Sequence, residues 1–515
     1  MADPRSQSQP DGVDGPSEVV DHGAFVWTDG DWRGFRLEEA ILYELHVGTF
    51  DDGSFAGVAR RLPELKALGV GAIELMPLAS FDGGRGWGYD GSFPFSVHQE
   101  YGGPQELKAL VNAAHSHGIG VILDIVYNHF GPTGTVLTEF GPYLNKTSDT
   151  PWGHAVNFDG EDSHEVRRFV VDNASYWLNA YHIDGLRLDA VHAILDNSEV
   201  SILSELEAAV SRCSQAAGRR LWLIAEHEDT EEALVAPASQ GGIGMDAVWN
   251  DPVHHAIHAA VTGERFGYYR PWGSIGQVAA SLEARSPGDD GAATNRSVGP
   301  CPSQFVSFSQ NHDQIGNRPK GDRLSTIVGV DAAITAAALI LLGPGTPLVF
   351  MGEEWAASTP FPYFCGPRNT ELDEAVRQGR RREFPAVASD ESADPLTEAT
   401  FVSACLDWEE RDQEPHSSAL ALFSRLIALR KLWPDLGSDA PTQVRYDESR
   451  RWLVMKRGRI DVVTNLGIEP IDLVRTGIQL PLTDGETNGP FALPPWSFMV
   501  VGPGPDSRTI LLRSD

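Results

Sequence analysis

Eight short apolar runs, separated by polar and helix-forming stretches, place the strongest constraint on the fold of this 515-residue chain. Each run is rich in Leu, Val, Ile, Ala or Phe and turns polar at its carboxyl end, as buried parallel strands do. The runs are ILYELHV (41–47), AIELMPL (72–78), GVILDIVYN (120–128), DGLRLDAV (184–191), LWLIAE (221–226), DAVWND (246–251), FVSFSQNHD (305–313) and TPLVFMGEE (346–354).

Helical stretches alternate with these runs. They lie at 54–68, 104–117, 165–181, 197–215 and, after the last run, 419–433. Eight strand–helix repeats predict an α/β fold, a (β/α)₈ TIM barrel, rather than an open doubly wound sheet. In such a barrel the carboxyl ends of all eight strands meet at one rim, where functional residues gather.

The remaining segments predict the domain organisation. Residues 1–38 are rich in Pro, Gly and Asp and are interpreted as a linker-like tail. We expect the barrel to occupy 39–435, with a small subdomain over the rim at about 129–162, where the connection is too long for a plain loop. Short alternating runs in 440–515 predict a C-terminal antiparallel β domain.

The net charge of −32 argues against nucleic acids and anionic membranes as partners, because both would be repelled. The simpler interpretation of this charge is that it keeps the protein soluble. The N-terminus lacks the basic and apolar regions of a signal peptide, and no apolar stretch reaches membrane-spanning length. The four cysteines are scattered without a CxxC pair, as free thiols in a reducing compartment would be. We therefore expect a cytoplasmic protein.

Three carboxylates stand at the carboxyl ends of separate runs: Asp189, Glu226 and Asp313. If the runs are parallel barrel strands, these acids meet at one rim. Three such acids suit acid and nucleophile chemistry on a neutral substrate, above all the opening of a glycosidic bond.

The neighbours of two of these acids differ. Arg187 and Asp189 share one face of a strand, and a guanidinium favours the ionised carboxylate that a nucleophile requires. The alternative is a structural ion pair lining the barrel. Glu226 ends an apolar strand carrying Trp222, a setting that could raise its pKa and keep a proton available. It could instead serve the first turn of a helix.

Further polar residues belong to the same rim. His312 precedes Asp313, and a carboxylate there could balance positive charge on a sugar ring, although Asp is also a common loop residue. Asp124 and His129 lie in LDIVYNH, at the end of the third run. Tyr89, in WGYDG, could stack on a sugar or could pack within its loop.

No cofactor is required by this chemistry. His254 and His258 have the four-residue spacing of zinc ligands on a helix, but no third ligand pattern accompanies them, and packing or surface roles are favoured. We expect no metal in the reaction, while the sequence leaves a structural calcium ion open.

Together, LDIVYNH, DGLRLDAVH, LIAEHED and FSQNHDQ resemble the four usual motifs of the α-amylase superfamily of glycoside hydrolases, in the usual order. The resemblance runs from about residue 40 to the C-terminus. It implies a retaining hydrolase in which Asp189 is the nucleophile, Glu226 the proton donor and Asp313 the transition-state stabiliser. It also implies a set of substrate-binding residues: Arg187, His129, His312, Asp124, Tyr89 and His192.

Within the superfamily, LYELHVGTF, SQNHDQIGNR, MGEEWAASTPF and GRRREF look most like the malto-oligosyltrehalose trehalohydrolase family. That resemblance implies an α-glucan oligosaccharide substrate with a trehalose end, cleaved to release trehalose. A related branching or debranching α-glucosidase and a non-catalytic glucan-binding barrel remain the alternatives.

Three departures from this family pattern stand out. The family usually carries an N-terminal β-sandwich module, of which residues 1–38 would be a remnant. The chain reads HEDT at 227–230, where an Asn-containing turn is usual, and FPYFCGPRN at 361–369 lacks an expected Asp-His pair. The last two changes would affect the subsites for the leaving trehalose.

Overall fold

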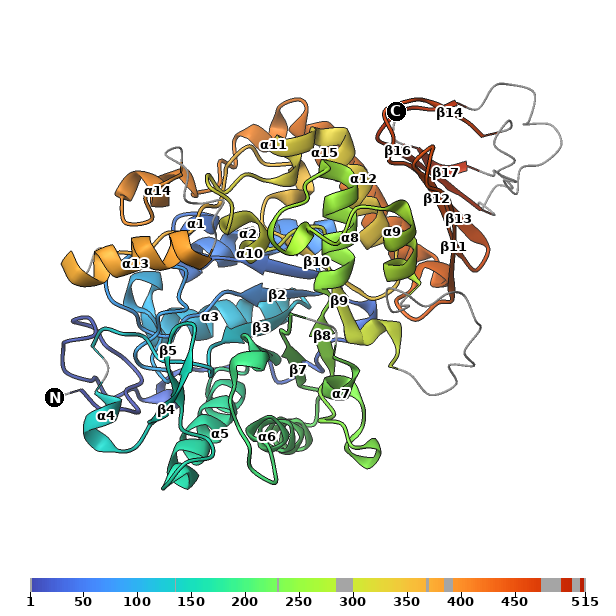
Figure 1. The fold of residues 1–515 in the computed structure, drawn as a ribbon. Helices are drawn as coiled ribbons and strands as arrows, with labels where there is room; N and C mark the ends of the chain where they lie inside the picture. The colour runs from blue at the N-terminus through green and yellow to red at the C-terminus, as the bar shows by residue number, and fades with distance from the viewer. Residues whose placement is uncertain are drawn as a thin grey trace.

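The computed structural model describes residues 2–134, 136–228, 231–283, 300–366, 370–383, 392–473, 492–502 and 510–513 (Figure 1). Eight parallel strands close into a barrel in the order β1-β10-β9-β8-β7-β6-β3-β2. The strands are β1 (Leu42–Leu45), β2 (Ala72–Leu75), β3 (Gly120–Ile125), β6 (Gly185–Leu188), β7 (Trp222–Ala225), β8 (Ala247–Trp249), β9 (Phe305–Ser307) and β10 (Thr346–Phe350). The predicted TIM barrel is confirmed.

The barrel strands are short and almost wholly buried, which explains why their runs read as continuous apolar sequence. Helices cover the outside of the barrel. The main ones are α2 (Phe55–Leu68), α3 (Gly103–Ser116), α5 (Ser163–Ala180), α6 (Ile202–Ala217), α8 (Asp251–Thr262), α9 (Ile275–Leu282), α12 (Val330–Leu341) and α15 (His416–Leu432).

All eight barrel strands end before the carboxyl ends of the predicted runs, and the difference is largest for β9 and β10. β9 ends at Ser307, and Asp313 lies instead in the short helix α10 (His312–Gly316). The helix begins there because the Asn311 side chain accepts hydrogen bonds from the backbone N–H groups of Asp313 and Gln314, both at 3.0 Å. β10 likewise ends at Phe350, before a 3₁₀ turn at Glu353–Trp355.

The long connection after β3 contains a helical turn, α4 (Leu137–Phe140), and an antiparallel pair of strands, β4 (Leu144–Thr150) and β5 (Gly153–Val156). This is the small inserted subdomain that the length of the connection predicted. A second excursion follows β10 and contains helices α13 (Thr370–Glu383) and α14 (Glu398–Ser403).

A separate five-stranded antiparallel sheet lies beside the barrel (Figure 1). Its strands run in the order β11 (Thr442–Asp447), β12 (Trp452–Arg457), β13 (Ile460–Asn465), β16 (Ser497–Val501) and β17 (Ile510–Arg513). The two units are joined by polar contacts: the Glu448 carboxylate accepts hydrogen bonds from the backbone N–H groups of Ile275 and Gly276, at the start of α9.

The segment before the barrel packs against α3 and against the amino ends of the barrel strands. Asp29 lies 2.8 Å from the rings of both His115 and His182, and the Trp32 indole donates to Asp184 at 2.8 Å. The domain boundaries inferred from the sequence remain predictions. Among the described residues no helix is long and apolar enough to cross a membrane, and the cytoplasmic location also remains a prediction.

Candidate active site

Residues from four barrel strands meet at the carboxyl-end rim. Asp124 and Arg187 are direct neighbours in the register of β3 and β6. Asp189 and Glu226 follow β6 and β7 immediately, and Asp313 follows β9 on α10. The structure therefore brings together the three acids that the sequence singled out.

Arg187 is the centre of this arrangement. It is fully buried, and its Nη1 donates to both oxygens of Asp124, at 2.7 and 2.8 Å, and to Oδ1 of Asp189 at 3.0 Å. Its Nη2 lies 2.8 Å from Oε2 of Glu226, and its guanidinium stacks over the Trp249 ring at 4.1 Å. One cation thus contacts three carboxyl groups, and Arg187 and Asp189 share a face, as predicted.

Glu226 has the environment of a proton donor. Burial raises its pKa well above the usual value, and the nearby charges of Asp189 and Asp313 add to that rise. Trp222 does not supply the apolar setting that we expected, because it lies at the start of β7 and packs against Phe35. The backbone N–H of Ala190, a residue with a left-handed φ of 41°, donates to Glu226 at 2.8 Å.

Asp189 is held by Asn128. The Asn128 amide donates to the Asp189 carboxylate at 2.7 Å and to the Asp189 carbonyl at 2.9 Å. The side chains of Asp189 and Glu226 are each 14% exposed, and that of Asp313 is 41% exposed. All three acids are therefore reachable from solvent, as a hydrolase requires.

A chain of hydrogen bonds crosses the floor of the site. The Tyr89 hydroxyl donates to Asp124 at 2.5 Å and lies 2.8 Å from Nε2 of His312. On its other side, His312 contacts the buried carboxylate of Glu44 through Nδ1 and through its backbone N–H. Burial alone would lower the pKa of His312, but the charge and hydrogen bond of Glu44 outweigh it and raise the pKa. Burial raises the pKa of Asp124 to about 6.

Two more of the predicted binding residues lie further out. His129 bonds Asn128 and stacks against Trp152, whose side chain is 41% exposed in the β4–β5 turn, with ring centroids 5.4 Å apart. His192 follows β6, and its Nε2 lies 3.5 Å from Glu228. The ring of Tyr89 stacks on His312, with centroids 5.2 Å apart.

Sequence reasoning missed two acids of the site. Glu44 lies in β1 among apolar residues, and only its alternation with them could have indicated that it faces the barrel interior. Asp251 follows β8 at the same rim, and its carboxylate accepts from Gln314 at 3.3 Å. Burial, with the nearby Asp313 charge, raises the pKa of Asp251 to about 7.

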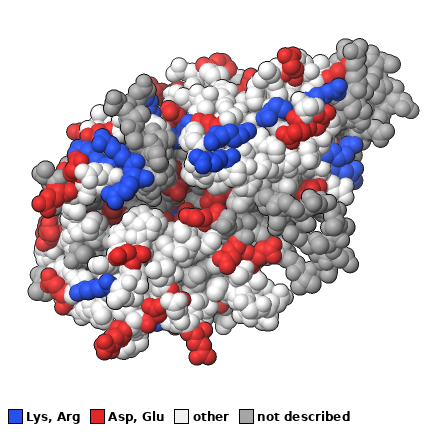
Figure 2. Space-filling model, viewed as in Figure 1, with Lys and Arg blue, Asp and Glu red and all other residues white. Residues whose placement is uncertain are grey.

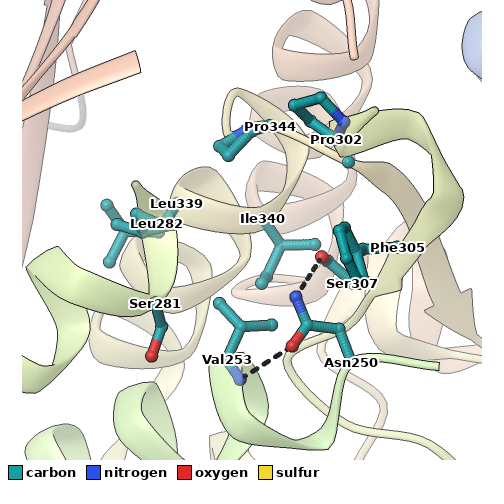
Figure 3. A pocket seen from close by; sticks show the side chains of 11 residues that line it. Asn250, Val253, Ser281, Leu282, Pro302, Phe305, Ser307, Leu339, Ile340 and Pro344 are labelled. Carbon is teal, nitrogen blue, oxygen red and sulfur yellow. Dashed lines mark hydrogen bonds between the residues drawn. The ribbon is translucent and has the colours of Figure 1, made fainter. Parts of the chain in front are cut away.

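A small cavity lies away from these acids, between the barrel wall and helices α8, α9 and α12 (Figure 3). Its volume is about 10 Å³, room for roughly one water molecule. Asn250 spans part of it with hydrogen bonds to Ser307 and to the backbone of Val253 (Figure 3). It is too small to admit a sugar.

The described residues contain no group of three or more His, Cys, Asp or Glu that could hold a metal ion. His254 bonds the Ser309 carbonyl at 2.8 Å and the Tyr269 hydroxyl at 2.9 Å, and His258 pairs with Glu264 at 2.8 Å. These two histidines are packing residues, as the sequence favoured.

Known proteins with similar sequences belong to one family of glycoside hydrolases. Residues 8–149 match the α-amylase catalytic domain family. The chain is 44% identical over 490 residues to the malto-oligosyltrehalose trehalohydrolase of Arthrobacter ramosus, covering 93% of this chain and 84% of that protein. The chain belongs to the malto-oligosyltrehalose trehalohydrolase family of glycoside hydrolases. A further trehalohydrolase of this family, from Rhizobium sp. (strain M-11), is 42% identical over 94% of this chain and 83% of its own length.

A solved structure shares the fold. A putative α-amylase from Salmonella typhimurium superposes with a TM-score of 0.85 at 35% identity, over 97% of this chain and 87% of that one. The two departures noted at 227–230 and 361–369 fall partly outside the described residues, because Asp229, Thr230 and 367–369 are not among them. Their effect on the trehalohydrolase subsites stays a prediction.

Proposed function

We propose that this protein hydrolyses the α-1,4 glucosidic bond beside the terminal trehalose of maltooligosyltrehalose, releasing trehalose and a shorter maltooligosaccharide. Membership of the trehalohydrolase family supports the choice of substrate. The observation that carries the chemistry is the shared contact of Asp189 and Glu226 with Arg187, at 3.0 and 2.8 Å. Two carboxyl groups facing one site, one of them with a raised pKa, are what glycoside hydrolysis requires.

In the first step, Glu226 donates its proton to the bridging oxygen while a carboxylate oxygen of Asp189 attacks the anomeric carbon. The bond to the leaving trehalose breaks, and a covalent glycosyl-enzyme forms on Asp189. Arg187 and Asn128 hold the attacking carboxylate in place. Asp313, the most exposed of the three acids, balances the positive charge that develops on the sugar ring.

In the second step, the ionised Glu226 removes a proton from water, and the water oxygen attacks the anomeric carbon. The bond to Asp189 breaks, and Glu226 regains its proton. Two inversions at one carbon give net retention of the α configuration. Tyr89, His129, His312 and Asp124 line the pocket of the sugar that is transferred, and His192 lies beyond Asp189. None of these steps needs a metal or organic cofactor.

Substrate choice is tested by giving the protein maltooligosyltrehalose and a plain maltooligosaccharide of equal length. We expect trehalose to be released at least about tenfold faster than any product from the plain chain, because about 1.4 kcal/mol of extra transition-state binding is a factor of ten. Equal or faster cleavage of the plain chain would favour the branching or debranching alternative.

The catalytic reading is tested with Asp189→Ala, which removes the nucleophile. Turnover should fall by at least about 10³-fold while glucan binding survives. Asp31→Ala, which changes a fully exposed acid far from the rim, is the matched control and should keep wild-type activity. A variant at position 189 that still turns over would show that another group is the nucleophile, and a wild-type protein that binds glucan without turnover would support the non-catalytic alternative. Proton NMR of the first product formed should detect the α anomer.

A further inference from the structure

Asp313 lies on a single helical turn, and in the part of the chain that the structure describes few groups hold its carboxylate. Its side chain is 41% exposed, and the His312 ring is 3.8 Å away. The hydrogen bond that reaches it comes from the Asn317 amide, whose Nδ2 lies 3.2 Å from Oδ1 of Asp313. The orientation of the Asn317 amide therefore decides whether this carboxylate meets a donor or an acceptor.

An asparagine amide has a donor end and an acceptor end, so a bond to one end fixes the direction of the other. The Oδ1 of Asn317 accepts a hydrogen bond of 2.8 Å from Nη2 of Arg380. A guanidinium can only donate, and it therefore selects the orientation in which Nδ2 faces Asp313. If the amide turned over, its oxygen would face the Asp313 carboxylate and repel it.

Arg380 comes from α13, in the excursion that follows β10, 63 residues beyond Asn317 in sequence. Its guanidinium stacks over the Tyr363 ring at 4.4 Å and also lies 3.4 Å from the carbonyl of Gly316. The helix is tied down one turn earlier, where Arg377 forms an ion pair with Asp394 at 3.0 Å. Basic side chains gather over α13 at the surface (Figure 2). Arg380 is partly buried, and its contacts with Gly316 and Asn317 direct it toward α10.

The segment carrying Asp313 is held from the opposite side as well. Arg318, the next residue after Asn317, makes two hydrogen bonds to Glu264, at 2.7 and 2.8 Å. With Arg318 anchored to the loop after α8 and Asn317 anchored to α13, the residues that follow Asp313 have little freedom to turn. Loss of either anchor should therefore change the position of the Asp313 carboxylate.

We propose that Arg380 is a positioning residue of the active site, which acts on Asp313 by fixing the amide of Asn317. The inference rests on the proposed role of Asp313 in stabilising the transition state. It assigns a function in catalysis to α13, a helix outside the eight strand–helix repeats. Because the effect falls on a transition-state contact, kcat should change more than KM.

The test uses the full-length protein and whichever glucan the wild type cleaves faster. Arg380→Ala should lower kcat by about 10–100-fold, with KM changed by less than about threefold, as expected when a catalytic group is misplaced by a fraction of an ångström. Arg381→Ala removes the same charge from an exposed neighbour on the same helix and should leave kcat unchanged. Arg380→Lys, which keeps a donor, should fall between the two.

Two readouts separate positioning from a general structural role. Guanidinium ion added at millimolar concentration should restore part of the kcat of Arg380→Ala and none of that of Asn317→Ala. In addition, Arg380→Ala and Asn317→Ala together should lower kcat no further than Asn317→Ala alone, because both changes break one relay.

The inference is overturned if Arg380→Ala behaves like Arg381→Ala, or if the losses from Arg380→Ala and Asn317→Ala multiply. It is also overturned if KM rises while kcat is preserved, since that would make Arg380 a substrate contact. A wild-type protein that cleaves neither glucan would instead overturn the proposed function itself.

Discussion

The Nη2 atom of Arg187 lies 2.8 Å from Oε2 of Glu226, yet burial raises the pKa of Glu226 well above its usual value. The same guanidinium also contacts Asp124 and Asp189. One positive charge cannot offset three negative charges in a buried site, so the cluster retains a proton. Burial is the main cause of the rise in the pKa of Glu226, and of Asp124 to about 6, and the neighbouring carboxylates add to it.

Glu226→Gln should separate the two roles of this acid. The amide keeps the shape but cannot donate a proton, so hydrolysis of the natural bond should fall by about 10³-fold. An α-maltosyl fluoride has a leaving group that needs no proton, and its first step should proceed at nearly the wild-type rate. Azide should then attack the glycosyl-enzyme and give an α-glycosyl azide, detected by mass spectrometry and NMR.

The pH profile gives the same assignment independently. Because the pKa of Glu226 is raised, its protonated form persists to higher pH, and activity falls as the pH rises through that pKa. The decrease in activity at alkaline pH that the wild type shows should be absent when the Glu226→Gln variant cleaves α-maltosyl fluoride. An unchanged alkaline limb in the variant would assign the proton to another group.

Glu44→Gln should weaken the site through His312. Removing the Glu44 charge lowers the pKa of His312, so its ring loses a proton near neutral pH and no longer donates toward Tyr89. We expect kcat/KM at pH 7 to fall by about tenfold, the cost of one charge-assisted hydrogen bond of about 1.5 kcal/mol, with partial recovery at lower pH.

The stability of the same variant has a predictable sign. A raised His312 pKa in the folded state adds stability below its ordinary value of 6.5, and that stability is lost as the pH rises through the folded-state pKa. The Tm of Glu44→Gln should therefore fall furthest behind wild type near pH 6 and less far at pH 9. The exposed Glu39→Gln is the control, and a pH-independent Tm difference would refute the coupling.

Gly316→Ala should distort α10 by a steric clash. A Cβ on Gly316 would lie 2.0 Å from Cζ2 and Cη2 of Trp87, whose ring stacks on Phe361 and meets His312 edge-on at 5.3 Å. Overpacking of this kind costs about 1–3 kcal/mol, and kcat should fall because His312 and Asp313 move with the helix.

A matched glycine tests that reasoning. Gly379, on α13, has no atom within 4 Å of an added Cβ, so Gly379→Ala should keep full activity and stabilise the helix by about 0.5–1 kcal/mol. Steady-state kinetics and near-UV circular dichroism, which reports the environments of the aromatic side chains, Trp87 among them, check both variants. Equal activity of the two alanine variants would exclude the clash.

The fold was predictable because its strands are buried on both sides and their sequences are apolar throughout. The strand ends were less predictable. In FVSFSQNHD the apolar character extends past Ser307, while the Asn311 cap that starts α10 is a local interaction that could also belong to a loop. The single apolar run therefore does not show that the strand has only three residues and that a helical turn follows it.

The central acids were predictable because each follows a strand on one rim, where parallel topology alone brings them together. Their supporting residues were not. Glu44 is one acid within an apolar strand, and Arg380 lies in an excursion whose path the strand pattern does not define. Trp222 misled for another reason: four extended residues separate it from Glu226 by about 13 Å, so its ring packs at the opposite end of the strand.

Asp251→Asn should stabilise the protein in a pH-dependent way. The pKa of Asp251 is raised to about 7, from an ordinary value of 3.8. Between these pH values the folded state holds a proton that the unfolded state has lost, so the free energy of unfolding of the wild type decreases as the pH rises. Asparagine does not titrate, and its amide oxygen can still accept from Gln314.

The gain should be small at pH 4.5 and should reach its full size near pH 8. One pKa unit corresponds to about 1.4 kcal/mol, and because Asp251 is partly exposed we expect roughly 2 kcal/mol, about half of the full amount. Differential scanning calorimetry at the two pH values measures the effect, with the exposed Asp31→Asn as control. A Tm difference that stays constant between pH 4.5 and pH 8 would mean that Asp251 is already ionised in the acid range.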